Sequence, residues 1–115
     1  MYTIYHNPRC SKSRQALEIL QKANVEIEII RYLDQSLGEQ QLKSLLTKLS
    51  MTAEELVRSG EDDFKQLKRA SGALSENQIM QAMLNNPKLI ERPIVVKGDR
   101  AVLGRPPENI RSLIE

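Results

Sequence analysis

Residues 2–30 read YTIYHNPRCSKSRQALEILQKANVEIEII. The stretch opens on a strand-like run at 2–5, continues with apolar residues at helical spacing over 12–23, and ends with apolar and acidic residues alternating over 25–30. This pattern predicts a strand, a helix and a second strand in that order. Asn24 is expected to end the helix, because asparagine tolerates the left-handed conformation of a helix cap. The three elements together predict a right-handed βαβ unit with parallel strands.

The middle of the chain has a helical pattern throughout. From Gly38 to Asn86 leucine, isoleucine and other apolar residues recur at spacings of three and four. Thr52 and Ser75 stand where two of these segments begin, and both residue types are preferred at helix N-caps. We therefore expect a helical insertion between the first βαβ unit and the remaining strands.

After Pro87 the pattern returns to strands. Residues 93–96 and 101–104, PIVV and AVLG, are apolar and predict two strands, and the four residues between them, KGDR, predict a tight antiparallel turn. The double proline at 106–107 is suited to the first turn of a last helix. The sequence thus predicts an α/β fold, a four-stranded mixed sheet with flanking helices and a helical insertion.

Composition agrees with one compact domain over residues 1–115. The chain is 40% hydrophobic and 28% charged, which is enough to bury a core without disulfides or a metal. Seventeen basic residues against fifteen acidic ones give a mixed surface, and 3% aromatic residues offer little for base stacking, so we expect no nucleic-acid partner. No apolar run approaches the ~20 residues that span a bilayer, and no secretory leader is visible. We expect a cytoplasmic protein without a membrane partner.

Cys10, the one cysteine of the chain, stands where the predicted helix begins. Free cysteine has a pKa near ~8.5, and helix N-termini and neighbouring cations lower it to roughly 3.5–7.5. Arg9, Lys12 and Arg14 supply such cations, and the same groups can bind an oxyanion. An inert, half-buried cysteine is the alternative, but such polar and basic neighbours make a poor apolar niche. We interpret Cys10 as a nucleophile.

The motif that begins at this cysteine is C-x-x-S and not C-x-x-C, because a serine, Ser13, stands three residues after Cys10. No second cysteine is present to resolve a mixed disulfide, so any thiol redox cycle needs an external thiol. His6 lies four residues before Cys10, and its ordinary pKa near ~6.5 lets it act as a local cation or as a hydrogen-bond donor.

Three separated strings carry a resemblance to a known family. They are HNPRC at 6–10, ERPIVV at 91–96 and GRP at 104–106. In this order and spacing they resemble the glutaredoxin-dependent arsenate reductase (ArsC) family over nearly the whole chain. The resemblance implies a thioredoxin-like fold with a helical insertion and a cis bond between Arg92 and Pro93.

The same resemblance implies roles for individual residues. It makes Cys10 the nucleophile and His6 the residue that assists its ionisation. The implied cycle passes through a cysteine–arsenic adduct, attack by glutathione as co-substrate, reduction to arsenite and recycling by glutaredoxin, with no bound cofactor and no metal. Four residues are expected to bind the oxyanion: Arg58, Arg92, Arg105 and Ser13.

The cysteine loop departs from that of the well-characterised arsenate reductases. They have a small residue before the cysteine and Gly-Thr-Ser after it, whereas this chain has Arg9 before it and SKS at 11–13. The chain therefore resembles a shorter branch of the family. Two alternatives remain at this point: a glutathione-dependent oxidoreductase with another substrate, and a regulator of the Spx type that binds RNA polymerase. Spx-type proteins commonly carry C-x-x-C and usually lack the Arg105-Pro pair, both unlike this chain.

Overall fold

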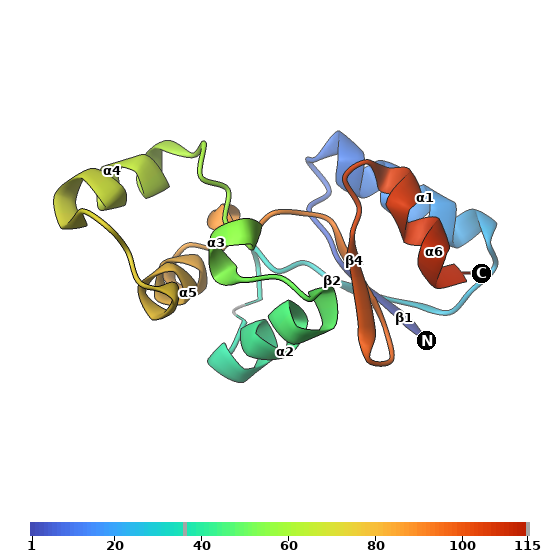
Figure 1. The fold of residues 1–115 in the computed structure, drawn as a ribbon. Coiled ribbons are helices and arrows are strands. Elements are labelled where there is room, and N and C mark those ends of the chain that lie inside the picture. The colour runs from blue at the N-terminus through green and yellow to red at the C-terminus, as the bar shows by residue number, and fades with distance from the viewer. Residues whose placement is uncertain (36, 115) are drawn as a thin grey trace. The chain divides into compact units, whose positions relative to one another are not determined.

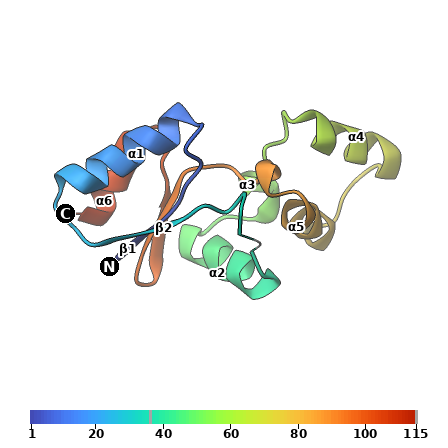
Figure 2. The same cartoon turned by 180° about the vertical axis from the view of Figure 1, so that it is seen from behind.

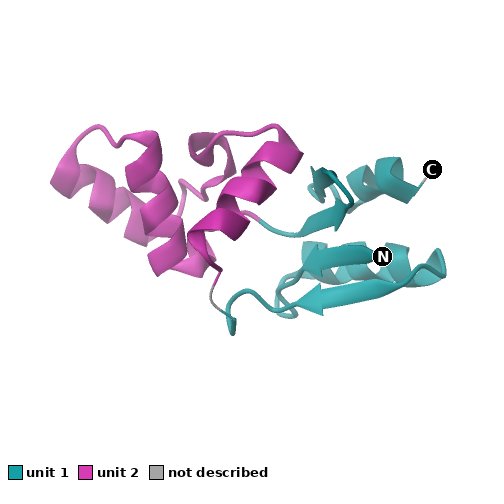
Figure 3. Ribbon diagram, turned by 90° about the horizontal axis from the view of Figure 1, so that it is seen from below, with its two compact units in different colours: residues 1–35, 92–115 teal, residues 36–91 magenta. Residues whose placement is uncertain are grey.

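The computed structural model describes residues 1–35 and 37–114. It divides into two compact units, shown in Figure 3. Unit 1 comprises residues 1–35 and 92–115, and unit 2 comprises residues 36–91. Unit 2 coincides with the predicted helical insertion. That the two units work as one domain stays a prediction. In the described part of the chain, no helix is long and apolar enough to cross a bilayer.

Unit 1 contains the sheet. Its strands are β1 (Tyr2–Tyr5), β2 (Ile27–Ile30), β3 (Ile94–Lys97) and β4 (Arg100–Leu103), in the order β2-β1-β3-β4. β1 and β2 are parallel, whereas β3 is antiparallel to both β1 and β4. The predicted four-stranded mixed sheet is confirmed. β2 begins two residues later than predicted, because its pairing with β1 begins where Tyr2 lies opposite Ile27.

The register of the sheet brings distant segments to one edge. Tyr5, the last residue of β1, pairs with Ile30 on one side and with Ile94 on the other. Ile94 in turn pairs with Leu103, the last residue of β4. The cysteine loop that follows β1 therefore leaves the sheet at the edge where β3 begins and β4 ends. Both Arg-Pro pairs of the sequence stand at this edge.

Helices cover one face of the sheet in unit 1. α1 (Ser11–Lys22) and the C-terminal pair, the 3-10 helix η2 (Pro107–Ile110) and α6 (Arg111–Ile114), lie side by side there (Figures 1 and 2). The predicted last helix is thus 3-10 in its first turn and α-helical afterwards. Asn24 has φ 58° after α1, as predicted. The buried core between sheet and helices contains Tyr2, Ile4, Ala16, Leu20, Val95, Ile110 and Leu113.

The described part of unit 2 consists of helices and their connections, with one isolated antiparallel bridge between Val57 and Ile90, and α5 packs against α2, α3 and η1. Thr52 and Ser75 each accept a hydrogen bond from the backbone N–H three residues on, and the side-chain oxygens of Glu55 and Gln78 at those positions accept one from the backbone N–H of the cap residue. Both predicted N-caps are therefore confirmed as capping boxes. The elements of unit 2 are α2 (Glu39–Leu49), α3 (Ala53–Leu56), α4 (Asp62–Ser71), α5 (Glu76–Asn85) and the 3-10 helix η1 (Pro87–Leu89).

Candidate active site

A tight turn carries the cysteine from β1 to α1. The Cys10 N–H donates to the Asn7 carbonyl at 3.0 Å, which closes a four-residue turn with Pro8 in its second position. The Asn7 side-chain oxygen accepts from the Arg9 N–H at 3.0 Å, and the Arg14 guanidinium donates to the Pro8 carbonyl at 2.9 Å. Asparagine and proline are favoured at the first two positions of such turns. The turn fixes the backbone that presents the thiol.

Cys10 is the N-cap of α1, as the sequence predicted. Its backbone is extended (φ −94°, ψ 123°) and its carbonyl accepts the first intrahelical bond, from the Arg14 N–H at 3.0 Å. The half-buried side chain makes no capping hydrogen bond. The first amides of a helix have no partner within the helix, and the first turn of α1 contains no acidic residue. This end of α1 can therefore attract an anion.

His6 and Ser13 form a buried pair beside the turn. The Nδ1 atom of His6 lies 2.6 Å from the Ser13 hydroxyl, and that hydroxyl also accepts from the Asn7 N–H at 3.0 Å. His6 is 6% exposed and Ser13 is 0% exposed. The sequence predicted that Ser13 binds the oxyanion. This geometry fits a positioning role better than direct contact, because the hydroxyl is buried and already has two partners; the oxyanion contact stays a prediction.

The environment of His6 favours its neutral form. Burial lowers the pKa of His6, and the positive charges of Arg31 and Arg14 lower it further. His6 is therefore neutral at neutral pH. Of the two roles that the sequence left open, this favours the hydrogen-bond donor over the local cation.

We expect the stability of the protein to fall when the pH drops below about 6.5, the usual pKa of histidine in an unfolded chain. Because the folded-state pKa of His6 is lower, the unfolded chain takes up the proton first, and stability is lost until the pH reaches the folded-state value. Urea unfolding of the wild type and of His6→Gln across this range measures the effect. His6 is the one histidine of the chain, so the variant isolates its contribution. Identical pH profiles for the two proteins would contradict this expectation.

Arg92 and Arg105 lie together at the edge of the sheet that carries the cysteine loop. The Arg105 guanidinium donates from Nη1 to the Arg92 carbonyl at 3.3 Å. The Nε–H of Arg92 is buried and has no hydrogen-bond partner within residues 1–35 and 37–114. Both arginines precede a proline through a cis bond, of which only the one at Pro93 was expected. Since buried donors are normally satisfied, Arg92 offers a donor for a bound anion.

Gly104 makes possible the close approach of the segment that contains Pro93 to the segment that contains Gly104 itself. Its N–H donates to the Pro93 carbonyl at 2.8 Å. A Cβ at this position would stand 2.8 Å from the Cγ of Pro93 and 3.4 Å from a methyl carbon of Ile110. The sequence did not assign this role, because no local pattern shows which residue faces a glycine across a sheet. Glycine is therefore required here for space.

Arg58 belongs to unit 2. Its guanidinium forms ion pairs with Glu61 at 2.9 Å and with Glu91 at 3.4 Å. The backbone N–H of Arg58 donates to the Leu89 carbonyl at 2.7 Å. Two carboxylates of the same unit thus lie against its one positive charge. Its predicted contact with the oxyanion stays a prediction.

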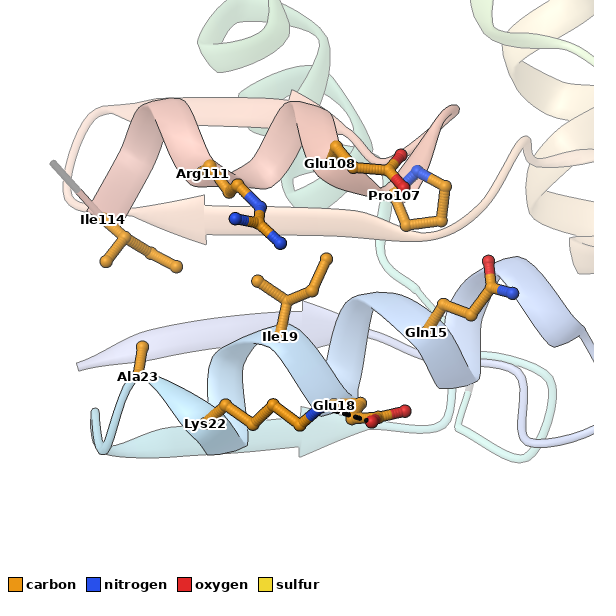
Figure 4. Close-up of a pocket in the computed structure, with 9 residues that line it drawn as sticks. All are labelled: Gln15, Glu18, Ile19, Lys22, Ala23, Pro107, Glu108, Arg111 and Ile114. Atoms are coloured by element: carbon orange, nitrogen blue, oxygen red, sulfur yellow. Dashed lines mark ion pairs between the residues drawn. The ribbon is translucent and has the colours of Figure 1, made fainter.

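Apart from the candidate active site, unit 1 has a cavity of about 650 Å³ between α1 and the C-terminal helices (Figure 4). Ile19 of α1 and Ile114 of α6 line it with apolar side chains, and the Glu18–Lys22 ion pair at 2.9 Å borders it. None of the residues predicted for the active site lines this cavity.

Oxyanion binding should depend on Arg92 and Arg105. Arsenate or sulfate at ~100 times its Kd should stabilise the wild type by roughly 2.7 kcal/mol. We expect Arg92→Ala and Arg105→Ala to remove most of the corresponding rise in melting temperature. Arg100→Ala is the matched control, because Arg100 lies at the hairpin end of β4, away from the site edge. Equal losses in all three variants would indicate non-specific charge.

Known proteins resemble this chain over nearly its whole length. The model of the ArsC family matches residues 5–113. The chain is 48% identical to the uncharacterized protein YfgD of Escherichia coli K12, covering 96% of this chain and 94% of that protein. It is 38% identical to an arsenate reductase of Neisseria meningitidis, covering 96% of each. The solved structure of an arsenate reductase from Vibrio cholerae superposes with a TM-score of 0.91 at 39% identity, covering 96% of this chain and 95% of that one.

Proposed function

Because the chain belongs to the ArsC family, we propose that it is an arsenate reductase in which Cys10 attacks the bound oxyanion and glutathione and glutaredoxin complete the reduction. The family and the thioredoxin-like fold are confirmed. The substrate, the two reductants and a cytoplasmic location belong to the proposal. They rest on the likeness to arsenate reductases and on the single cysteine.

The observation that carries the proposal is that the segments holding Cys10, Arg92 and Arg105 all leave the sheet at the same edge. Cys10 is the N-cap of α1 and lies on the loop that follows β1. Arg92 lies just before β3 begins, and Arg105 lies just after β4 ends, at the same edge of the sheet. Arsenate is a tetrahedral dianion, and guanidinium groups offer paired planar donors that match two of its oxygens. Neutralising the substrate also reduces its repulsion of an attacking thiolate.

The proposed reaction balances with three thiols. The Cys10 thiolate bonds to arsenic and one arsenate oxygen leaves as water after protonation. Glutathione then supplies the second sulfur. Two electrons pass from the two sulfurs to arsenic, which gives arsenite and a Cys10–glutathione disulfide. Glutaredoxin attacks the glutathione sulfur of this disulfide, which releases the Cys10 thiol and leaves glutaredoxin joined to glutathione in a mixed disulfide. One protein cysteine is sufficient for this route.

The test is steady-state arsenate reduction by the purified protein with glutathione and glutaredoxin. We expect turnover that requires all three components. Absence of turnover with either glutaredoxin or thioredoxin would overturn the proposal. Co-purification with RNA polymerase that survives Cys10→Ser would then support the regulator, whereas thiol-dependent turnover of another compound would support a different substrate.

A further inference from the structure

The Ser13 hydroxyl has two partners and one of them can only donate. Serine offers one O–H donor and two acceptor lone pairs. The Asn7 backbone N–H donates to the Ser13 oxygen at 3.0 Å and so uses one lone pair. The second partner is the Nδ1 atom of His6, at 2.6 Å. The Ser13 hydroxyl makes no other hydrogen bond within the described residues.

This pairing decides which ring nitrogen of His6 carries the proton. If Nδ1 were protonated, it would donate to Ser13, and the proton of a fully buried hydroxyl would have no acceptor. A buried polar hydrogen without a partner is costly. If Nδ1 is unprotonated, it accepts the Ser13 proton, and both Nδ1 and the hydroxyl are satisfied. The neutral ring then carries its proton on Nε2.

We propose that Ser13 is a positioning residue that fixes His6 as the Nε2–H tautomer and holds the ring against the cysteine turn. One hydroxyl thereby joins three points: the end of β1 at His6, the turn at Asn7, and the first turn of α1 at Ser13 itself. Its acceptor side fixes the backbone and its donor side orients the imidazole. The hydrogen bond that one ring nitrogen of a histidine makes commonly decides whether the other nitrogen carries the proton.

The consequence for chemistry is that His6 presents a neutral N–H donor. The Nε2 atom makes no hydrogen bond with the part of the chain that the structure describes. A neutral donor can stabilise a thiolate or a substrate oxygen through a hydrogen bond without adding a full charge. This consequence for catalysis rests on the proposed function, whereas the tautomer itself does not.

Long-range proton–nitrogen NMR of histidine-labelled protein near neutral pH tests the tautomer directly. The chain has one histidine, so the spectrum reports on His6 alone. In the wild type we expect a protonated Nε2 and an unprotonated, hydrogen-bonded Nδ1. In Ser13→Ala we expect the Nδ1 resonance to move as it loses its donor, with both tautomers contributing. Ser11→Ala removes an exposed hydroxyl from the same helical turn and should leave the His6 resonances unchanged.

The kinetic test uses the same variants. Ser13→Ala should lower kcat/KM for arsenate about 3- to 10-fold, as expected for one neutral hydrogen bond, and Ser13→Thr, which keeps the hydroxyl, should restore both the tautomer and part of the rate. A protonated Nδ1 in the wild type would overturn the proposal, even if no variant folded. An unmoved Nδ1 resonance in Ser13→Ala would also overturn it. Absent turnover in the wild type with the expected spectra would count against arsenate reduction only.

Discussion

Replacing Cys10 with serine is expected to abolish arsenate reduction without destabilising the fold. The variant lacks the nucleophile, and loss of a nucleophile commonly lowers turnover by about 10³-fold or more. Cys10 is the N-cap of α1 and its side chain makes no capping bond, whereas serine is a preferred N-cap. The free energy of unfolding should therefore stay the same or rise by up to about 1 kcal/mol. Turnover assays and urea unfolding of the same preparation measure both effects.

Two control measurements on Cys10→Ser test this interpretation. Cys10→Ser should still show the oxyanion-dependent rise in melting temperature, because neither Arg92 nor Arg105 has changed. Its residual arsenate reduction should match that of glutathione and glutaredoxin alone. Retained turnover would show that Cys10 is not the nucleophile, and a lowered melting temperature would contradict the N-cap argument.

Gly104→Ala should destabilise the protein by about 1 to 3 kcal/mol, the usual cost of overpacking. The added Cβ would stand 2.8 Å from the Cγ of Pro93, and Pro93 is buried and rigid. The two segments would have to separate, which also weakens the contact between Arg105 and the Arg92 carbonyl. We expect a fall in melting temperature of roughly 4 to 15 °C and a weaker affinity for arsenate.

Gly60→Ala is the matched control for this substitution. A Cβ at Gly60 meets nothing within 4 Å, and its backbone is not in the left-handed region. The change should therefore be neutral or slightly stabilising. If Gly104→Ala were as stable as Gly60→Ala, the close approach at Pro93 would not limit this edge of the sheet.

Local patterns predicted most of the secondary structure. The alternation in residues 25–30, the N-caps at Thr52 and Ser75 and the turn around Gly98 each depend on neighbours a few residues away. Such signals survive in the folded chain because propensity and pattern agree there. The boundaries moved by one or two residues, since a strand ends where its partner ends, and partners are not local. The start of β2 opposite Tyr2 shows this.

The candidate site was only partly predictable. The sequence alone indicated Cys10 at a helix start, because this is a local pattern. It also indicated the two Arg-Pro strings, because these resemble motifs of the ArsC family. The buried bond between His6 and Ser13 was not visible. Serine at this position was expected to face the oxyanion, and no sequence rule shows that its hydroxyl lies inside, against a histidine seven residues earlier.

The sequence by itself determined the order of elements, the single cysteine and the basic character of its loop, because these follow from spacing and residue type. Only the tertiary structure decided which distant groups meet. The pairing of Tyr5 with Ile94, and of Ile94 with Leu103, brings three segments to one edge of the sheet. Backbone hydrogen bonds between strands and the exclusion of water from the core fix that register, and both act between residues that are far apart along the chain.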